Sequence, residues 1–327
     1  MPKAKKRQPG GVRKRANDGG AVLVLGGRLV ERTTAHISRL VNRQEFETDD
    51  AAEAYLQSII NQDIIAPATT PLEQAQDLMY DAWEAPSAKR GVALARKALS
   101  ICPDCADAYV LLAQESADSL QQARDLFAQG VAAGERALGQ EGFRECEGHF
   151  WGFVETRPYM RARQGLAQCL WLLGEREAAV ADYQEMLRLN PNDNQGIRYI
   201  LAACLLELGR NRELMELLGR FKDEPTAVWE YTRALVDFRS RGGSRRGDRL
   251  LRAAFKVNPC VPPFLLGKRR LPRRLPAYIG FGDEDEAVAY VVEFGEGWMA
   301  TPGALPWLAA RWESLLSGGS PSAQGRR

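Results

Sequence analysis

The chain has 327 residues, 45% of them hydrophobic and 26% charged, which is the composition of an ordinary globular protein. Its 44 basic and 42 acidic residues give a formal charge of +2, which argues against a surface devoted wholly to nucleic acid. Only two histidines are present, His36 and His149, so sites built from several histidines are excluded.

The charge is unevenly distributed, because residues 1–20 carry seven basic side chains and one acidic one. We expect a disordered basic tail over 1–20, since so polar a segment cannot bury enough apolar surface to fold. No apolar run approaches the ~20 residues that cross a bilayer, and the first residues lack the apolar core of a signal peptide. The six cysteines do not resemble a disulfide framework, so we expect a cytoplasmic protein.

A short helical N-terminal extension is predicted over 21–71, with two helices within 29–65. Asp49 and Asp50 favour the start of the second helix, because acidic side chains stabilise the positive end of the helix dipole. A segment rich in proline and threonine then separates this extension from the next part of the chain.

A repeat of 34 residues decides the predicted fold. Pro191, Pro225 and Pro259 are each 34 residues apart, and each ends a helical pattern. This is the period of the tetratricopeptide helix–turn–helix repeat. In the best repeat, 160–193, alanines allow two helices to approach closely and Gly174 breaks the chain between them.

The same pattern continues upstream, where Pro103 closes a comparable helix. From Pro103 to Pro191 is 88 residues, or two repeats plus an insertion that we place near 140–159. We therefore predict an all-α fold, a tetratricopeptide-like α-solenoid of about five helix pairs over 72–261 with helical extensions at both ends.

Three aromatic residues, Phe150, Trp151 and Phe153, are concentrated in the insertion. They are interpreted either as a plug that fills the gap opened by the insertion or as side chains that line a groove and grip a partner. Both interpretations stay open at this point.

After the array, a proline-rich segment and C-terminal capping helices are predicted over 262–316, followed by a flexible tail over 317–327. The chain resembles a tetratricopeptide-repeat protein, and its C-terminal half, roughly 160–313, is similar to the suppressor-of-tumorigenicity-seven family. That family is similar to a membrane protein at its N-terminus, which has no counterpart here, and the resemblance implies no catalytic motif. The residues that carry it are Asn258, Pro259, Val261, Pro262, Leu265, Leu266, Leu271, Pro272, Asp285, Glu286, Ala287, Ala289, Tyr290, Trp298, Gly303, Ala304, Leu305 and Leu308.

The first helix of each repeat is expected to line a concave groove. Arginine pairs with carboxylates through two hydrogen bonds, and glutamine can bond a peptide backbone, so these positions suit an extended, acidic or C-terminal peptide. The alternative is a solvated polar face. The predicted groove residues are Arg161, Gln164, Gln168, Gln195, Arg198, Tyr199, Trp229 and Arg233.

A basic patch is predicted from clusters within 239–274. Together with the basic tail it suggests, as an alternative, an RNA- or ribosome-associated protein that binds phosphates. No stacking aromatics are interleaved with these residues, so nucleic acid is the second choice. The patch residues are Arg245, Arg246, Arg249, Lys268, Arg269 and Arg270.

Two short motifs bear on metal binding and catalysis. Cys102 and Cys105 have the spacing of zinc ligands, as do Cys146 and His149, but whether the two pairs converge is left open. We predict no metal and no cofactor. Cys146 with His149 is also the one candidate for a nucleophile and its base, and it is weak. The sequence therefore favours a non-enzymatic adaptor or scaffold that binds a protein or peptide.

Overall fold

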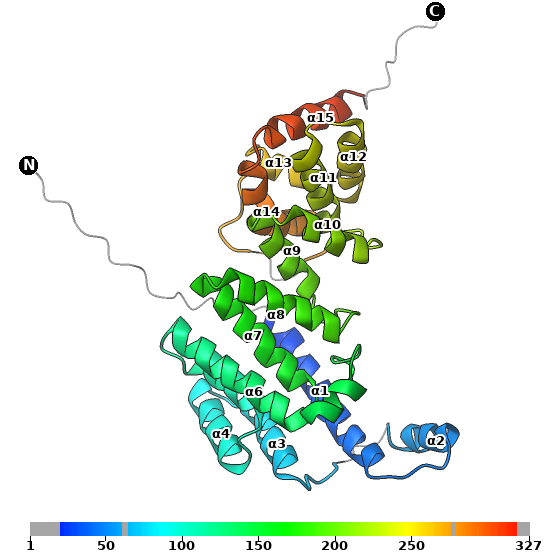
Figure 1. Cartoon of the computed structure of the whole chain (residues 1–327), viewed down its shortest axis with the longest axis vertical. Coiled ribbons are helices and arrows are strands. Elements are labelled where there is room, and N and C mark those ends of the chain that lie inside the picture. The colour runs from blue at the N-terminus through cyan, green and yellow to red at the C-terminus, as the bar shows by residue number, and fades with distance from the viewer. Residues whose placement is uncertain (1–19, 61–64, 276–278, 319–327) are drawn as a thin grey trace, which may run out of the picture.

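The computed structural model describes residues 20–60, 65–275 and 279–318, which form fifteen helices and no strands (Figure 1). Ten of these helices form five consecutive pairs, which confirms the predicted fold class. The pairs are α3 (Pro71–Trp83) with α4 (Ala88–Ile101), α5 (Ala106–Glu115) with α6 (Leu120–Glu145), α7 (Arg157–Leu173) with α8 (Arg176–Leu189), α9 (Ile197–Glu207) with α10 (Asn211–Arg220), and α11 (Ala227–Arg241) with α12 (Arg245–Val257).

Local sequence signals set the ends of these helices. Thr70 and Glu73 form a reciprocal capping box at the start of α3. Gly174 ends α7 in the left-handed conformation, at φ 88°, which side chains other than glycine rarely adopt. Each repeat proline lies in the turn that follows the second helix of a pair, as the 34-residue period predicts: Pro191 after α8, Pro225 after α10 and Pro259 after α12.

Close packing within a pair and between neighbouring pairs depends on small residues. Ala167 and Ala179 are fully buried where α7 meets α8. A Cβ atom on Gly134 of α6 would come within 2.8 Å of the Cβ atom of Tyr159 on α7, so no larger residue fits there without a shift. These contacts hold α7 against its partner α8 and against α6 of the preceding pair.

The insertion near 140–159 is shared between the end of α6, the irregular segment 146–156 and the start of α7. Phe150 is fully buried, with its ring centroid 5.1 Å from that of Phe143 and 6.0 Å from that of Tyr159. Phe153, by contrast, is exposed. Phe150 thus fills the core between α6 and α7, as expected for a plug.

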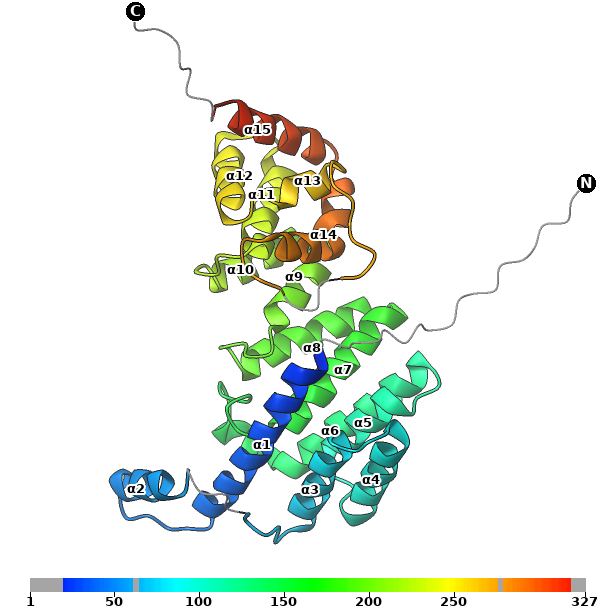
Figure 2. The same cartoon turned by 180° about the vertical axis from the view of Figure 1, so that it is seen from behind.

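Helices that precede and follow the five pairs pack against the array (Figures 1 and 2). α1 (Gly20–Asn42) and α2 (Asp49–Ile59) precede the pairs, while α13 (Val261–Leu265), α14 (Glu284–Met299) and α15 (Ala304–Gly318) follow them. We call the face formed by the first helices α3, α5, α7, α9 and α11 the inner face. α1 contacts α3 and α7, and α14 packs on α9 and α11, so both lie on the inner face.

The N-terminal extension and the tails differ in part from the predictions. The first N-terminal helix is not short, because α1 has 23 residues and begins at Gly20, before the predicted start at 29. The tails predicted over 1–20 and 317–327 lie almost wholly outside the described residues. Within the described part of the chain, no helix has the combination of length and apolar character that a membrane span requires.

Candidate binding surface

Arg161, predicted to bind a partner's carboxylate, is already bound by two carboxylates of this chain. Its Nε and Nη2 atoms donate to Asp107 at 2.8 and 2.6 Å, and its Nη1 and Nη2 atoms donate to Glu31 of α1 at 3.0 and 2.9 Å. Burial alone would lower the pKa of Arg161, but the two carboxylates outweigh burial and raise it. Arg161 therefore holds α1 in place.

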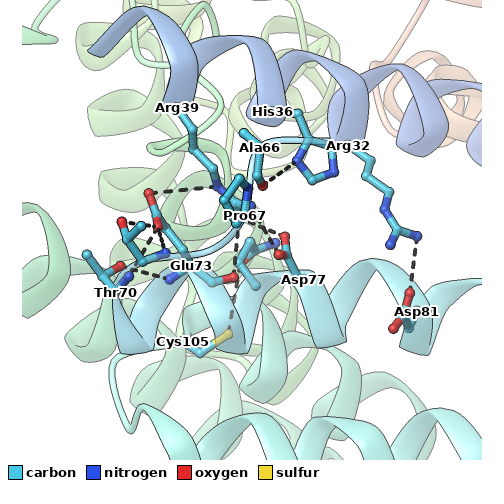
Figure 3. Close-up of polar contacts among 12 residues, drawn as sticks. Arg32, His36, Arg39, Ala66, Pro67, Thr70, Glu73, Asp77, Asp81 and Cys105 are labelled. Carbon is cyan, nitrogen blue, oxygen red and sulfur yellow. Dashed lines mark hydrogen bonds and ion pairs between the residues drawn. The ribbon is translucent and has the colours of Figure 1, made fainter. Parts of the chain in front are cut away.

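A second buried charged contact lies about two turns further along α1, near its C-terminal end (Figure 3). Arg39 donates to both carboxylate oxygens of Asp77, at 2.7 and 3.0 Å, and to the carbonyl oxygen of Glu73 at 3.2 Å. Between the two charged contacts, Ala35 is buried against Tyr80 and Val154. The inner face of the first three pairs is thus covered by the chain's own helix.

Beyond α1, the three predicted glutamines lie on the inner face, and two of them are joined by a hydrogen bond. Gln195 donates to the side-chain oxygen of Gln164 at 3.0 Å, across the junction of α7 with the turn before α9. Gln168 is exposed. Gln164 and Gln195 are half-buried, and the side-chain oxygen of Gln195 is buried with no hydrogen-bond partner among the described residues.

Arg198 and Tyr199 share the carboxylate of Glu224. Arg198 lies 2.8 Å from both Asp193 and Glu224, and the Tyr199 hydroxyl donates to Glu224 at 2.5 Å. Burial, and then this hydrogen bond, raise the pKa of Tyr199 to about 12, so its hydroxyl stays protonated at neutral pH.

Two other predicted groove residues differ from expectation. The prediction that Trp229 faces a partner is wrong, because it is fully buried between the rings of Tyr199 and Phe221. Arg233 pairs with Glu230 at 2.8 Å. The three predicted arginines therefore all lie on first helices, but carboxylates of the same chain occupy each of them, and they form no free cradle.

A buried polar network that is not predicted from the sequence anchors α14. Glu286 accepts hydrogen bonds from the backbone amides of Ala227 and Gly282, at 2.8 and 2.7 Å, and from the Asn258 side chain at 2.9 Å. The Tyr231 hydroxyl donates to the carbonyl oxygen of Asn258 at 2.6 Å. Asn258 and Glu286 are both among the residues that carry the family resemblance, and that resemblance is the sequence signal that could have pointed to the network.

A pocket of about 520 Å³ lies where α14 meets α9 and the start of α11. Its lining is mainly apolar, and Ile279 and Phe281 stand at its rim with half and about three-quarters of their surface exposed (50% and 78%). The other apolar lining residues are Tyr199, Ile200, Val228, Ala289, Tyr290 and Phe294. Of the predicted groove residues, Tyr199 lines this pocket.

The predicted basic patch is not assembled into one surface. Arg311 of α15 binds Asp248 of α12 at 2.7 Å, whereas Glu313 binds Lys268 at 3.2 Å. Residues two apart on a helix point about 200° apart, so Lys268 and α12 lie on opposite flanks of α15. Three of the six patch residues also have acidic partners: Arg246 with Asp237, Lys268 with Glu313 and Arg269 with Glu284.

The cysteine and histidine motifs have no metal cluster around them. Among the residues that the structure describes, no group of three or more His, Cys, Asp or Glu side chains could hold a metal ion. Cys105 is buried beside Gln76, and His149 is exposed in the turn after α6.

Comparison with known proteins agrees with the resemblance seen in the sequence and extends it. The family described as "ST7 protein" matches residues 55–319, which include the first repeats as well as the C-terminal half. The human "Suppressor of tumorigenicity 7 protein-like" is 29% identical over 271 residues, covering 75% of this chain and 46% of that protein. The Caenorhabditis elegans "Protein ST7 homolog" is 27% identical, covering 73% of this chain and 51% of that protein.

The chain thus spans about half the length of the curated relatives it matches. Among solved structures, YrrB, described as a TPR protein with an unusual peptide-binding site, matches with a TM-score of 0.40 and 18% identity. The match covers 62% of this chain and 90% of that one. With a family match over most of its length, this chain belongs to the ST7 protein family.

Proposed function

We propose that this protein is a non-enzymatic adaptor that binds a segment of a partner protein on its inner face. The observation that carries the proposal is the apolar pocket of about 520 Å³ between α9, α11 and α14. An apolar hollow of this size with exposed aromatic and aliphatic side chains at its rim is typical of a binding site for an apolar anchor.

The absence of a catalytic role is part of this proposal. Burial, and then the nearby Glu155 and Glu145, raise the pKa of the Cys146 thiol. A nucleophilic cysteine needs the opposite shift, because the thiolate is the reactive form. This supports reading Cys146 and His149 as structural residues.

The pocket is tested by removing its rim. An Ile279→Ser/Phe281→Ser variant of the full chain is expected to recover at least about tenfold less of a partner in cross-linking pull-downs, since it loses the apolar anchor contacts. Both side chains are exposed, so we expect stability to change little. The readout is quantitative mass spectrometry of the recovered proteins.

Leu271→Ser/Leu275→Ser is the matched control, because these two leucines are exposed in the same connecting segment but do not line the pocket. Proteins that the control retains and the rim variant loses are pocket partners. Identical recovery by both variants contradicts the proposal.

A second candidate function, RNA binding, is favoured by one face of α12. Arg245, Arg249, Arg252 and Lys256 are spaced four, three and four residues apart, which places them on one side of the helix. All four are exposed, and none forms an ion pair with another described residue. Four unpaired cations in a row can contact successive phosphates.

We expect an oligo(U) probe to bind with a slope of log K against log salt of about −3, as about four single-strand phosphate contacts give. Replacing the four cations with glutamine should bring this slope close to zero. The control replaces Arg270, Arg273 and Arg274, which belong to the segment after Lys268 rather than to α12. If the two variants bind alike, or the intact chain does not bind at low salt, α12 is not an RNA site.

A further inference from the structure

The contact between α1 and the inner face is mainly polar. Among the side chains described in α1, Ala35 is the one apolar side chain that is fully buried, Ile37, Leu40 and Val41 are partly buried, and Val30 is 65% exposed. Apolar burial scales with area, so the methyl group of Ala35, which is the apolar group buried against Tyr80 and Val154, contributes little at that point of the contact. Charged contacts through Glu31, Arg32 and Arg39 therefore supply much of the specificity, and those of Glu31 and Arg39 are the buried ones, because Arg32 pairs with Asp81 at 3.1 Å from a side chain that is 31% exposed.

α1 also leaves space beneath it. A cavity of about 120 Å³ lies between α1 and the array, with Ala35 and Arg39 on one side. Side chains of α3 and α7, among them Tyr80 and Tyr159, and Val154 line the other side. Apolar groups that face such a space lose dispersion contacts, so α1 fits this part of the inner face incompletely.

The charges of the site define what fits it better. Arg157 and Arg161 face Glu31 at one end, while Glu73 and Asp77 face Arg39 at the other (Figure 3 shows the second end). Glu31, Ala35 and Arg39 follow one another at intervals of four, on one side of the helix, over about 12 Å. The site is thus complementary to a helix that carries an acidic, an apolar and a basic residue at intervals of four.

We propose that α1 is a displaceable occupant of the inner face and that its site binds a partner helix of the same charge pattern with a larger apolar side chain at the Ala35 position. This rests on the proposed function and names the partner class for the N-terminal half of the inner face. Binding of the partner helix is then coupled to release of α1. Its net binding free energy is the difference between its own contacts with the site and those of α1.

The test uses the full chain and a labelled synthetic peptide of residues 30–43 carrying Ala35→Leu. Glu31→Gln/Arg39→Gln in the chain weakens the hold of α1 and leaves the site's own residues intact, so this chain should bind the peptide at least about tenfold more tightly than the wild type. Ala35→Leu in the chain should improve the fit of α1, raise the melting temperature and weaken peptide binding several-fold.

Recognition of the charge pattern is tested with a second peptide of residues 30–43, which carries Glu31→Gln and Arg39→Gln in addition to Ala35→Leu. It should bind at least about tenfold more weakly than the first peptide. Equal affinity for all three chains, or for both peptides, overturns the proposal. The Ile279→Ser/Phe281→Ser chain should bind the peptide as the wild type does. A failure of the peptide experiment therefore leaves the pocket test standing, and the two proposals can fail separately.

Discussion

An Arg161→Ala variant is expected to lose about 3–5 kcal/mol of unfolding free energy, because it strands the carboxylate of Asp107 in the protein interior. Asp107 is fully buried, and after the substitution its remaining side-chain hydrogen bond comes from Gln76 at 2.8 Å. Glu31 would keep one weaker contact, with Arg157 at 3.3 Å. Urea denaturation followed by circular dichroism measures the loss.

Arg136→Ala is the matched control for this experiment. Arg136 also forms a 2.7 Å ion pair, with Asp104, but both side chains are more than a third exposed to solvent. An exposed pair contributes less than ~1 kcal/mol, so this variant should remain close to the wild type. An equal loss in both variants would contradict the assigned role of Arg161.

A double variant separates a stranded charge from lost packing. If the cost of Arg161→Ala comes from Asp107, then Arg161→Ala/Asp107→Ala should lose less than the sum of the two single variants. Additive losses would show that Arg161 acts through its packing, including its guanidinium 5.3 Å from the centre of the Trp83 ring, rather than through the buried acid.

The helix pairs were predictable because their signals are local. A helix begins at a cap and ends at a glycine or before a proline, and the 34-residue spacing of Pro191, Pro225 and Pro259 repeats these signals in register. Small residues such as Ala167 and Ala179 mark the seam within a pair. None of this depends on knowing what packs on the outside of the array.

The candidate site was less predictable because it depends on contacts between distant segments. The repeat register places Arg161 and Arg198 on first helices correctly, but it does not reveal that Glu31 lies 130 residues away in sequence and 2.9 Å away in space. Trp229 faces the core because neighbouring rings enclose it. The pocket exists because α14 returns to α9, and no periodic pattern encodes that return.

Glu286→Gln is expected to lose about 3 kcal/mol of unfolding free energy, although the substitution changes neither size nor shape. The three groups that approach the two oxygens of Glu286, Ala227, Gly282 and Asn258, are all hydrogen-bond donors. Glutamine replaces one of these oxygens with an amide that also donates, so at least one buried donor is left without an acceptor. The negative charge that stabilises the start of α11 is lost as well.

Glu284→Gln is the control, because Glu284 starts the same helix but is half exposed in its pair with Arg269. It should cost less than ~1 kcal/mol, measured by the same urea titration. If Glu286→Gln behaves like this control, the network does not anchor α14. If it unfolds as predicted, binding at the pocket must also weaken near the unfolding midpoint, because α14 supplies Ala289, Tyr290 and Phe294 to the lining. The stability of the fold and the competence of the pocket then depend on the same buried carboxylate.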